Sequence, residues 1–168
     1  AIKAAGQVVE ADYEVPYLAH ACMEPMNCTA QVRPERVDVW VGTQNPEAAL
    51  AAAAEITGVV LENVYVHNCF LGGGFGRRGN TDHVRQAVTV AKALGGQPVQ
   101  LIWSREEDIR HDWYRPMAAI RFRAALDANG QPTAYFNRSV THSILAGIRA
   151  DNIKDGIDRT SVEGLANI

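Results

Sequence analysis

The feature that most constrains this chain is a run of glycines, Gly72-Gly73-Gly74-Phe75-Gly76, which is followed by Arg77 and Arg78. Four glycines in five residues remove the side chains where the backbone must bend sharply or lie against something bulky. Three consecutive glycines also cost conformational entropy on folding, and a simple turn needs only one or two. The segment therefore indicates a specialised loop.

The glycine run lies between a predicted strand at residues 64–71 and a predicted helix at about residues 81–94. The N–H groups of such a loop, together with the helix start, can receive phosphate or other oxyanions. Arg77 and Arg78 could add charge-assisted donors. Phe75 could wedge against a flat ligand or pin the loop to the core. The alternative interpretation is a tight strand-to-helix connection whose arginines are merely solvated.

The first half of the chain has clear strand and helix signals. Valines alternate with other residues at 37–41, the period of a half-buried strand, and the turn at 33–36 pairs this strand with residues 28–32. A helix follows, with Asn45 as N-cap, Pro46 at its first position and Gly58 suited to close it in a left-handed conformation. Residues 8–15 form a further extended segment, which Pro16 ends.

The second half completes an α+β pattern. The helix at 81–94 has one apolar face. The apolar run at 99–103 predicts a central strand, and residues 104–112 a charged loop or short helix. Asn129-Gly130 predicts a hairpin of residues 120–126 and 133–141. The apolar face of the helix consists of Val84, Ala87, Val88, Ala91 and Leu94.

We therefore expect a mixed sheet with hairpins and two main helices that cover one face of the sheet. The length of 168 residues is enough for one domain with its own core. We place the domain at residues 1–147. Residues 148–168 form a polar tail, patternless from about Gly147 and expected to be exposed or disordered, especially at 149–159.

Composition narrows the classes of function. The chain is 47% hydrophobic and 21% charged with a formal net charge of −3, which is typical of a globular protein and favours neither a nucleic-acid nor an anionic-membrane partner. No apolar stretch approaches the roughly 20 residues of a membrane span. The chain opens at Ala1 without an initiator Met, so the lack of a signal-peptide pattern says little about its compartment, which stays unknown.

Several residue types invite a metal or disulfide interpretation. The three cysteines, Cys22, Cys28 and Cys69, include no CxxC pair, so we expect free, partly buried thiols, although Cys22 and Cys28 could pair in an oxidising compartment. His20 and Glu24 lie four residues apart, but no second cluster stands at metal-ligand spacing. The sequence thus predicts no metal ligands.

A dinucleotide-binding site is a specific competitor. Gly74 to Gly79 matches GxGxxG, a helix and a strand follow, and Glu106 stands where a ribose-binding acid is expected. Two details weaken this interpretation. The preceding strand carries His67 and Asn68, whereas a first strand of this type is apolar, and the segment at 79–83 is polar.

The order of the motifs resembles a known family. Thr43-Gln44-Asn45, then Gly73-Gly74-Phe75-Gly76, then the helix at 87–94, then Arg105-Glu106-Glu107-Asp108 are similar to the first molybdenum-cofactor domain of the xanthine dehydrogenase and aldehyde oxidoreductase family. The segments 20–28, 72–78 and 112–116 look closest to the beta subunit of its isoquinoline 1-oxidoreductase branch. The resemblance covers roughly residues 8–145 and implies a bacterial oxidoreductase.

The resemblance assigns roles to individual residues. Gly73, Gly74, Phe75 and Gly76 take the place of the family loop that wraps the pterin and the metal oxo group with backbone amides, and Arg77 follows it. Gln44 stands in place of the family's glutamine that donates to an oxo ligand; without the resemblance, it would be an ordinary loop residue. The implied cofactor is molybdopterin with molybdenum, in the cytosine dinucleotide form usual in bacterial relatives, and the implied partners are the rest of the large subunit and a small subunit with [2Fe-2S] clusters.

The implied chemistry is hydroxylation of an electrophilic carbon of a small molecule with oxygen from water. The family's catalytic base is a Glu in a later glycine-rich segment, and Glu24, Glu106, Glu107 and Glu163 do not stand in that context. We therefore expect a fragment with no catalytic residue, inactive alone. Purine-oxidising relatives carry a substrate-contacting Glu where this chain has Gly79, which favours an N-heteroaromatic compound or an aldehyde over a purine.

Overall fold

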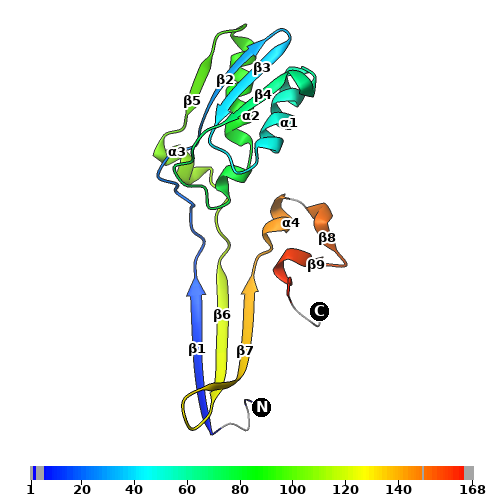
Figure 1. Cartoon of the computed structure of the whole chain (residues 1–168). Helices are drawn as coiled ribbons and strands as arrows, with labels where there is room; N and C mark the ends of the chain where they lie inside the picture. The colour runs from blue at the N-terminus through cyan, green and yellow to red at the C-terminus, as the bar shows by residue number, and fades with distance from the viewer. Residues whose placement is uncertain (1, 3–5, 149, 165–168) are drawn as a thin grey trace. The chain divides into compact units, whose positions relative to one another are not determined.

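A computed structural model describes residues 2, 6–148 and 150–164 of the chain. It divides into two compact units, one of residues 19–113 and one of residues 1–18 with 114–168. The length alone had indicated one domain with a single core. The two units have separate sheets (Figure 1).

The unit of residues 19–113 contains a four-stranded sheet in the order β4-β3-β2-β5. Strand β3 pairs with β4 in parallel, and the other two pairs are antiparallel. The expected mixed sheet, the hairpin of β2 and β3, and the two main helices are confirmed. The elements of this unit are β2 (Asn27–Arg33), β3 (Arg36–Val41), α1 (Pro46–Thr57), η2 (Leu61–Asn63), β4 (Val64–Asn68), η3 (Arg77–Gly79), α2 (Asp82–Ala93), β5 (Val99–Ile102) and α3 (Arg105–Arg110).

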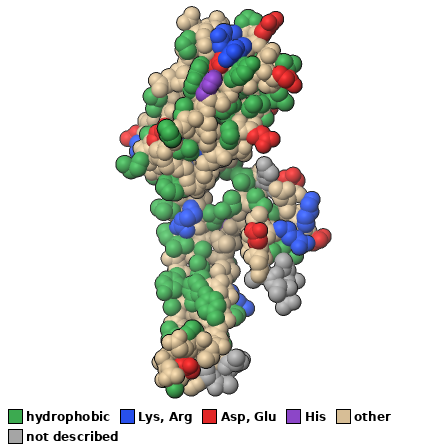
Figure 2. Space-filling model, viewed as in Figure 1, with side chains coloured by type: hydrophobic (Ala, Val, Ile, Leu, Met, Phe, Trp, Pro, Cys, Tyr) green, Lys and Arg blue, Asp and Glu red, His purple; other side chains and the backbone are tan. Residues whose placement is uncertain are grey.

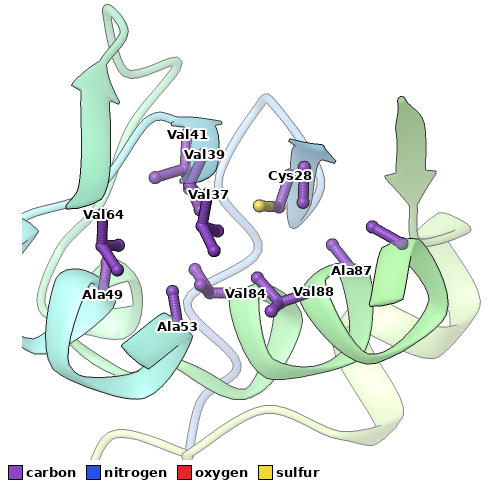
Figure 3. Packing of buried hydrophobic residues seen from close by; sticks show 12 residues of the cluster. Cys28, Val37, Val39, Val41, Ala49, Ala53, Val64, Val84, Ala87 and Val88 are labelled. Carbon is purple, nitrogen blue, oxygen red and sulfur yellow. The ribbon is translucent and has the colours of Figure 1, made fainter. Parts of the chain in front are cut away.

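Helices α1 and α2 pack against the same sheet, and the core lies between them and β2, β3 and β4 (Figure 3). Valines at alternate positions of β3 point to this side because side chains alternate across a strand. The alanines of α1 allow the helix to approach closely. The fully buried core side chains include Cys28, Val37, Val39, Val41, Ala49, Ala53, Val84, Ala87, Val88 and Ala91.

The punctuation of helix α1 is confirmed. The Asn45 side chain accepts a hydrogen bond from the N–H of Ala48, and Pro46 stands at the helix start. Gly58 ends the helix with φ 76°, the left-handed conformation that glycine adopts without a steric penalty. The helix therefore begins and ends where its sequence signals lie.

Three details of this unit differ from expectation. Strand β5 lies at an edge of the sheet, where β2 is its one partner in the described part of the chain, and Ile102 is 61% exposed. The prediction of a central strand at 99–103 was therefore wrong. Strand β4 ends at Asn68, before the apolar residues Phe70 and Leu71, which belong to the following loop. Leu94 is 54% exposed, because α2 ends at Ala93.

The second unit is built on a three-stranded antiparallel sheet in the order β1-β6-β7. The predicted hairpin is confirmed, and β6 and β7 bracket its Asn129-Gly130 turn. The polar tail is not patternless: residues 153–158 form a short hairpin, while Arg149 lies outside the described residues. The elements are β1 (Gln7–Val15), β6 (Ala118–Leu126), β7 (Pro132–Thr141), α4 (Ile144–Ile148), η4 (Ala150–Asn152), β8 (Ile153–Lys154), β9 (Ile157–Asp158) and η5 (Arg159–Ser161).

The sheet topology and the helix lengths bear on two alternatives, a dinucleotide-binding domain and a membrane-spanning helix. A dinucleotide-binding domain with the GxGxxG motif requires a parallel sheet, whereas β3 and β4 are the one parallel pair in the described part of the chain. The dinucleotide-binding alternative is therefore wrong. None of the helices formed by the described residues has the length and apolar character needed to cross a membrane.

Candidate functional site

The glycine loop connects β4 to η3 and α2, and its backbone takes left-handed conformations at three positions. The φ angles are 101° at Gly73, 53° at Phe75 and 100° at Gly76. Glycine adopts such angles freely, but a residue with a side chain pays about 1–2 kcal/mol. The strain at Phe75 shows that the surrounding contacts impose the shape of this loop.

Two further glycines are required because other segments lie against the loop. A Cβ atom on Gly72 would come within 2.4 Å of the Cβ of Glu24. A Cβ atom on Gly74 would come within 2.7 Å of Oε1 of Gln44. The glycine run was expected to bend sharply or to lie against a bulky group. Part of that group is the protein itself, because Glu24 and Gln44 both pack against the loop.

The predicted site residue Gln44 contacts the loop directly. Its side-chain Oε1 accepts a hydrogen bond from the backbone N–H of Gly76 at 2.9 Å, and its backbone N–H donates to the carbonyl of Arg78 at 3.1 Å. With the amide oxygen turned toward Gly76, the amide nitrogen is the free end. Its N–H groups donate to none of the residues that the structure describes, and the residue is exposed.

The loop also has free backbone donors. The N–H groups of Gly72 and Gly76 are engaged by Glu24 and Gln44, each through a side-chain oxygen. By contrast, no residue within 2, 6–148 and 150–164 accepts from the N–H of Gly73, Gly74 or Phe75. Consecutive amides of this kind in a turn with left-handed positions form a concave site for anions.

Phe75 does not pin the loop to the core, which was one of the two roles considered for it. Its side chain is 75% exposed. Phe70 is fully exposed and Met23 is 89% exposed, and the backbone of Glu24 pairs with Gly72. Exposed apolar side chains thus belong to the loop and to the segments next to it in the sequence and in the pairing with Glu24.

Arg77 is placed differently from the expectation that it would offer donors to a ligand. It is 1% exposed, and its guanidinium donates to both carboxylate oxygens of Asp82 at 3.0 and 2.7 Å. Its Nε lies 3.3 Å from the buried carboxylate of Asp112. Burial alone would raise the pKa of Asp82, but hydrogen bonds from His83 and Arg77 hold that pKa well below its ordinary value. Arg77 therefore anchors the end of the loop.

Arg78 is fully buried, and each of its three guanidinium nitrogens has an acceptor. Nε donates to the carbonyl of Gly73 at 2.8 Å, and Nη1 to that of Gly42 at 3.2 Å. Nη2 donates to the carbonyl of Glu24 at 2.6 Å and lies 3.1 Å from Oε2 of the same residue. The interpretation of solvated arginines is wrong for both Arg77 and Arg78, because both side chains are buried. Arg77 pairs with the carboxylates of Asp82 and Asp112, and Arg78 satisfies the polar backbone beneath the loop.

Sequence reasoning missed the role of Glu24. Its Oε2 accepts from the N–H of Gly72 at 2.7 Å, and its Oε1 accepts from Nδ2 of Asn27 at 2.7 Å. Burial would raise the pKa of Glu24, yet these hydrogen bonds and the charge of Arg78 lower it below its ordinary value. One sequence signal pointed to Glu24: it lies within residues 20–28, one of the segments on which the family resemblance rests.

The other candidates form no separate site. His20 contacts Asp112, with Nδ1 2.9 Å from Oδ1, and so has a different partner from Glu24. No group of three His, Cys, Asp or Glu side chains that could hold a metal ion occurs among the described residues. The three cysteines are free, with Cys22 and Cys28 buried and Cys69 exposed. The candidate site is accordingly a set of hydrogen-bond donors and not a set of metal ligands.

The sequence matches a known protein family and several known proteins. The model of the family described as molybdopterin cofactor-binding domain matches residues 1–143. The membrane-bound aldehyde dehydrogenase [pyrroloquinoline-quinone] of Gluconacetobacter polyoxogenes is 34% identical over 134 residues, which are 80% of this chain and 17% of that protein. The isoquinoline 1-oxidoreductase subunit beta of Brevundimonas diminuta is 36% identical over 107 residues, 63% of this chain and 14% of that protein.

The fold has solved counterparts as well. The crystal structure of quinoline 2-oxidoreductase from Pseudomonas putida 86 matches 82% of this chain and 18% of the solved chain, with a TM-score of 0.65 and 23% identity. At this identity the likeness concerns the fold. The chain spans 17% and 14% of the lengths of the two curated relatives.

Proposed function

The chain belongs to the molybdopterin cofactor-binding domain family, and from this premise we propose that it is a fragment of the molybdopterin-binding subunit of a molybdenum hydroxylase. The relatives make it part of an oxidoreductase family. We propose further that the parent enzyme oxidises an N-heteroaromatic compound or an aldehyde with oxygen derived from water. The fragment is inactive alone, because the glutamate that serves as base lies in a later segment of the parent.

The observation that carries this proposal is the row of free N–H groups at Gly73, Gly74 and Phe75. A phosphate-bearing cofactor with oxo ligands is an acceptor of hydrogen bonds, and backbone amides can approach it closely only where side chains are absent. Gly76 contributes by fixing Gln44. The residues present therefore fit the cofactor that the family binds.

Gln44 supplies a side-chain donor at this loop that none of the described residues engages. Its oxygen is held by the N–H of Gly76, so its nitrogen is left to donate to an oxo ligand. The reverse orientation of the amide would set two donors against each other at Gly76. Arg77 takes part by anchoring the loop through Asp82 and not by a direct contact.

When bound, the molybdenum cofactor would supply the two-electron redox chemistry and activate the water-derived oxygen. This chain would bind and orient the cofactor through the loop amides and Gln44. We propose the cytosine dinucleotide form, and a small subunit with [2Fe-2S] clusters that accepts the electrons.

Gly79 supports the proposed substrate class. It stands where purine-oxidising relatives carry a glutamate, and a Cβ atom at Gly79 would meet nothing within 4 Å. Gly79 has no side chain, so this position offers no carboxylate that could pair with a purine edge. Initial rates of the parent enzyme with isoquinoline, an aromatic aldehyde and hypoxanthine test this point, and a preference for hypoxanthine would contradict it.

The second unit supports the proposed partnership with the rest of the large subunit. Tyr13, Phe122 and Tyr135 form a row of edge-to-face or tilted rings across its three strands, with centroids 5.8 and 6.0 Å apart. Tyr13 and Tyr135 are 56% and 66% exposed, and Figure 2 shows hydrophobic side chains at the surface of this sheet. An open apolar sheet face needs cover. We propose that residues 1–147 are part of a molybdopterin-binding domain, that 148–168 lead to the rest of the parent, and that this rest covers the sheet.

Elemental analysis of the full-length parent, purified with its natural partner subunit, tests the proposed function. About one molybdenum per large subunit, with iron in the partner, is the expected result. If a folded and matured complex contained neither molybdenum nor iron, the proposed function would be wrong and the parent would share only its fold with the molybdenum hydroxylases. Molybdenum also distinguishes this proposal from the quinone cofactor in the name of the aldehyde dehydrogenase relative.

A non-catalytic structural module is the remaining alternative. It predicts that Gln44→Ala and Gly74→Ala in the parent change stability and leave the cofactor content as it was. Our proposal predicts loss of cofactor. We also expect the 168-residue chain alone to bind the cofactor weakly or not at all, because ligand sites tend to lie between domains. Stoichiometric retention by the purified chain would overturn that expectation.

A further inference from the structure

We propose that Arg78, held by Glu24, is a positioning residue that fixes the two groups of cofactor donors relative to each other. The inference rests on the proposed function, since it concerns the same loop. It assigns a task to a buried guanidinium that neither the family resemblance nor the sequence pattern had assigned.

The side chain of Arg78 joins three separate segments. Through Nε it holds the carbonyl of Gly73, inside the glycine loop. Through Nη1 it holds the carbonyl of Gly42, just after strand β3. Through Nη2 it holds the carbonyl of Glu24. A guanidinium presents its donors in a rigid fork, so these three contacts set the relative placement of the three segments.

The main chain of Arg78 reaches the other donor. Its carbonyl accepts hydrogen bonds from Oγ1 of Thr43 at 2.8 Å and from the N–H of Gln44 at 3.1 Å. Arg78 therefore holds the glycine loop through its side chain and the backbone of Gln44 through its carbonyl. Together with the hydrogen bond from Gly76 to Gln44, Arg78 thus keeps the free nitrogen of Gln44 and the free amides at 73–75 at a constant spacing.

The charge of Arg78 is balanced from one side. Glu24 is its one carboxylate partner among the described residues, with Oε2 3.1 Å from Nη2. The same oxygen accepts from the N–H of Gly72, which ties the start of the loop to the fork. A buried charge that loses its partner is costly, so Glu24 is needed for Arg78 to remain in this position.

The test uses the full-length parent with its partner subunit and measures two quantities, the molybdenum content per folded large subunit and the melting temperature. Arg78→Lys keeps the charge but replaces the fork by a single ammonium. We expect its molybdenum content to fall about tenfold or more. In the fraction that keeps the metal, the electron paramagnetic resonance signal of molybdenum is expected to shift, because the donors have moved.

Val88→Ala is the matched control, since Val88 is fully buried in α2 and contacts the core, not the loop. It is expected to lower the melting temperature while the molybdenum content per folded chain stays at the level of the unmodified parent. If both variants lost molybdenum in proportion to their melting temperatures, Arg78 would be a structural residue only and the inference would be overturned.

Glu24→Gln keeps the test decisive if Arg78→Lys fails to fold. Asn27 and Gly72 donate to different oxygens of Glu24, so an amide group would turn its NH₂ toward one donor. We expect molybdenum loss with a fold that survives, because the side chain of Glu24 is 33% exposed. Unchanged molybdenum and an unchanged signal in these variants would refute the inference alone, whereas an unmodified parent without molybdenum would refute the proposed function.

Discussion

Gln44 and Gly74 are in such close contact that no side chain fits between them. A Cβ atom on Gly74 would lie 2.7 Å from Oε1 and 2.8 Å from Cδ of Gln44. The same Gln44 oxygen accepts the N–H of Gly76. The absence of a side chain at Gly74 therefore allows Gln44 to lie across the loop and to keep its amide nitrogen free.

Gly74→Ala in the parent is expected to displace Gln44 and to lower the molybdenum content about tenfold. Gln44→Ala should lower it as well, while its melting temperature stays close to that of the unmodified protein, because Gln44 is exposed. Gln97→Ala, at another exposed glutamine, is the control and should retain the metal. Elemental analysis and thermal unfolding give both readouts, and full retention of molybdenum by Gly74→Ala would contradict this prediction.

Replacement of Gly58 and of Gly72 by alanine is expected to lower the free energy of unfolding for two different reasons. Gly58→Ala meets no atom within 4 Å but must keep φ 76°, so it should cost about 1 kcal/mol. Gly72→Ala forces its Cβ to within 2.4 Å of Glu24, and overpacking of this kind should cost about 3 kcal/mol. Urea unfolding followed by tryptophan fluorescence measures both. Equal costs would argue against the close packing of Glu24 on the loop.

The lowered pKa of Glu24 predicts a dependence of stability on pH. Its carboxylate is favoured in the folded state, so its contribution is complete above the ordinary value of 4.5 and is lost as the pH falls through the lower pKa of the folded state. Glu24→Gln should be about 1–3 kcal/mol less stable at pH 7, and the difference should shrink as the pH falls below 4.5.

Urea unfolding at several pH values tests this prediction. All three tryptophans, Trp40, Trp103 and Trp113, lie in the unit that contains Glu24, so their fluorescence reports on its unfolding. Glu62→Gln, at an exposed position in η2, serves as the control. A stability difference between Glu24→Gln and the unmodified chain that stayed constant from pH 7 to pH 3 would contradict the proposed hydrogen bonds.

The three cysteines are expected to react at very different rates. Burial raises the pKa of Cys28 to about 12 and also raises that of Cys22, so their reactive thiolates are rare at pH 8. Cys69 is exposed. Brief alkylation with iodoacetamide in native buffer should label Cys69 alone, and unfolding in urea should release the other two. Peptide mass spectrometry identifies the sites, and rapid native labelling of Cys28 would be inconsistent with its burial.

The sequence predicted elements well where the signal was local. Asn45, Pro46 and Gly58 located both ends of α1, because capping and the left-handed terminus depend on neighbouring residues. Asn129-Gly130 located the hairpin of β6 and β7 for the same reason. The central position assigned to residues 99–103 was wrong, because strand order depends on distant pairing, and the apolar composition of a strand does not reveal its neighbours.

The sequence by itself determined that residues 72–76 form a loop of unusual backbone, since glycines in such a run have no other use, and it determined the family through the order of its motifs. Only the tertiary structure decided what Arg77 and Arg78 do. As sequence they are two cations beside an anion-binding loop, and they would be expected to face a ligand. Folding brings Asp82 and Asp112 to Arg77 and Glu24 to Arg78, and it surrounds the guanidinium of Arg78 with four backbone carbonyls. These acceptors offset the cost of removing each guanidinium from water, so both arginines are buried and the backbone amides and Gln44 are left as the donors.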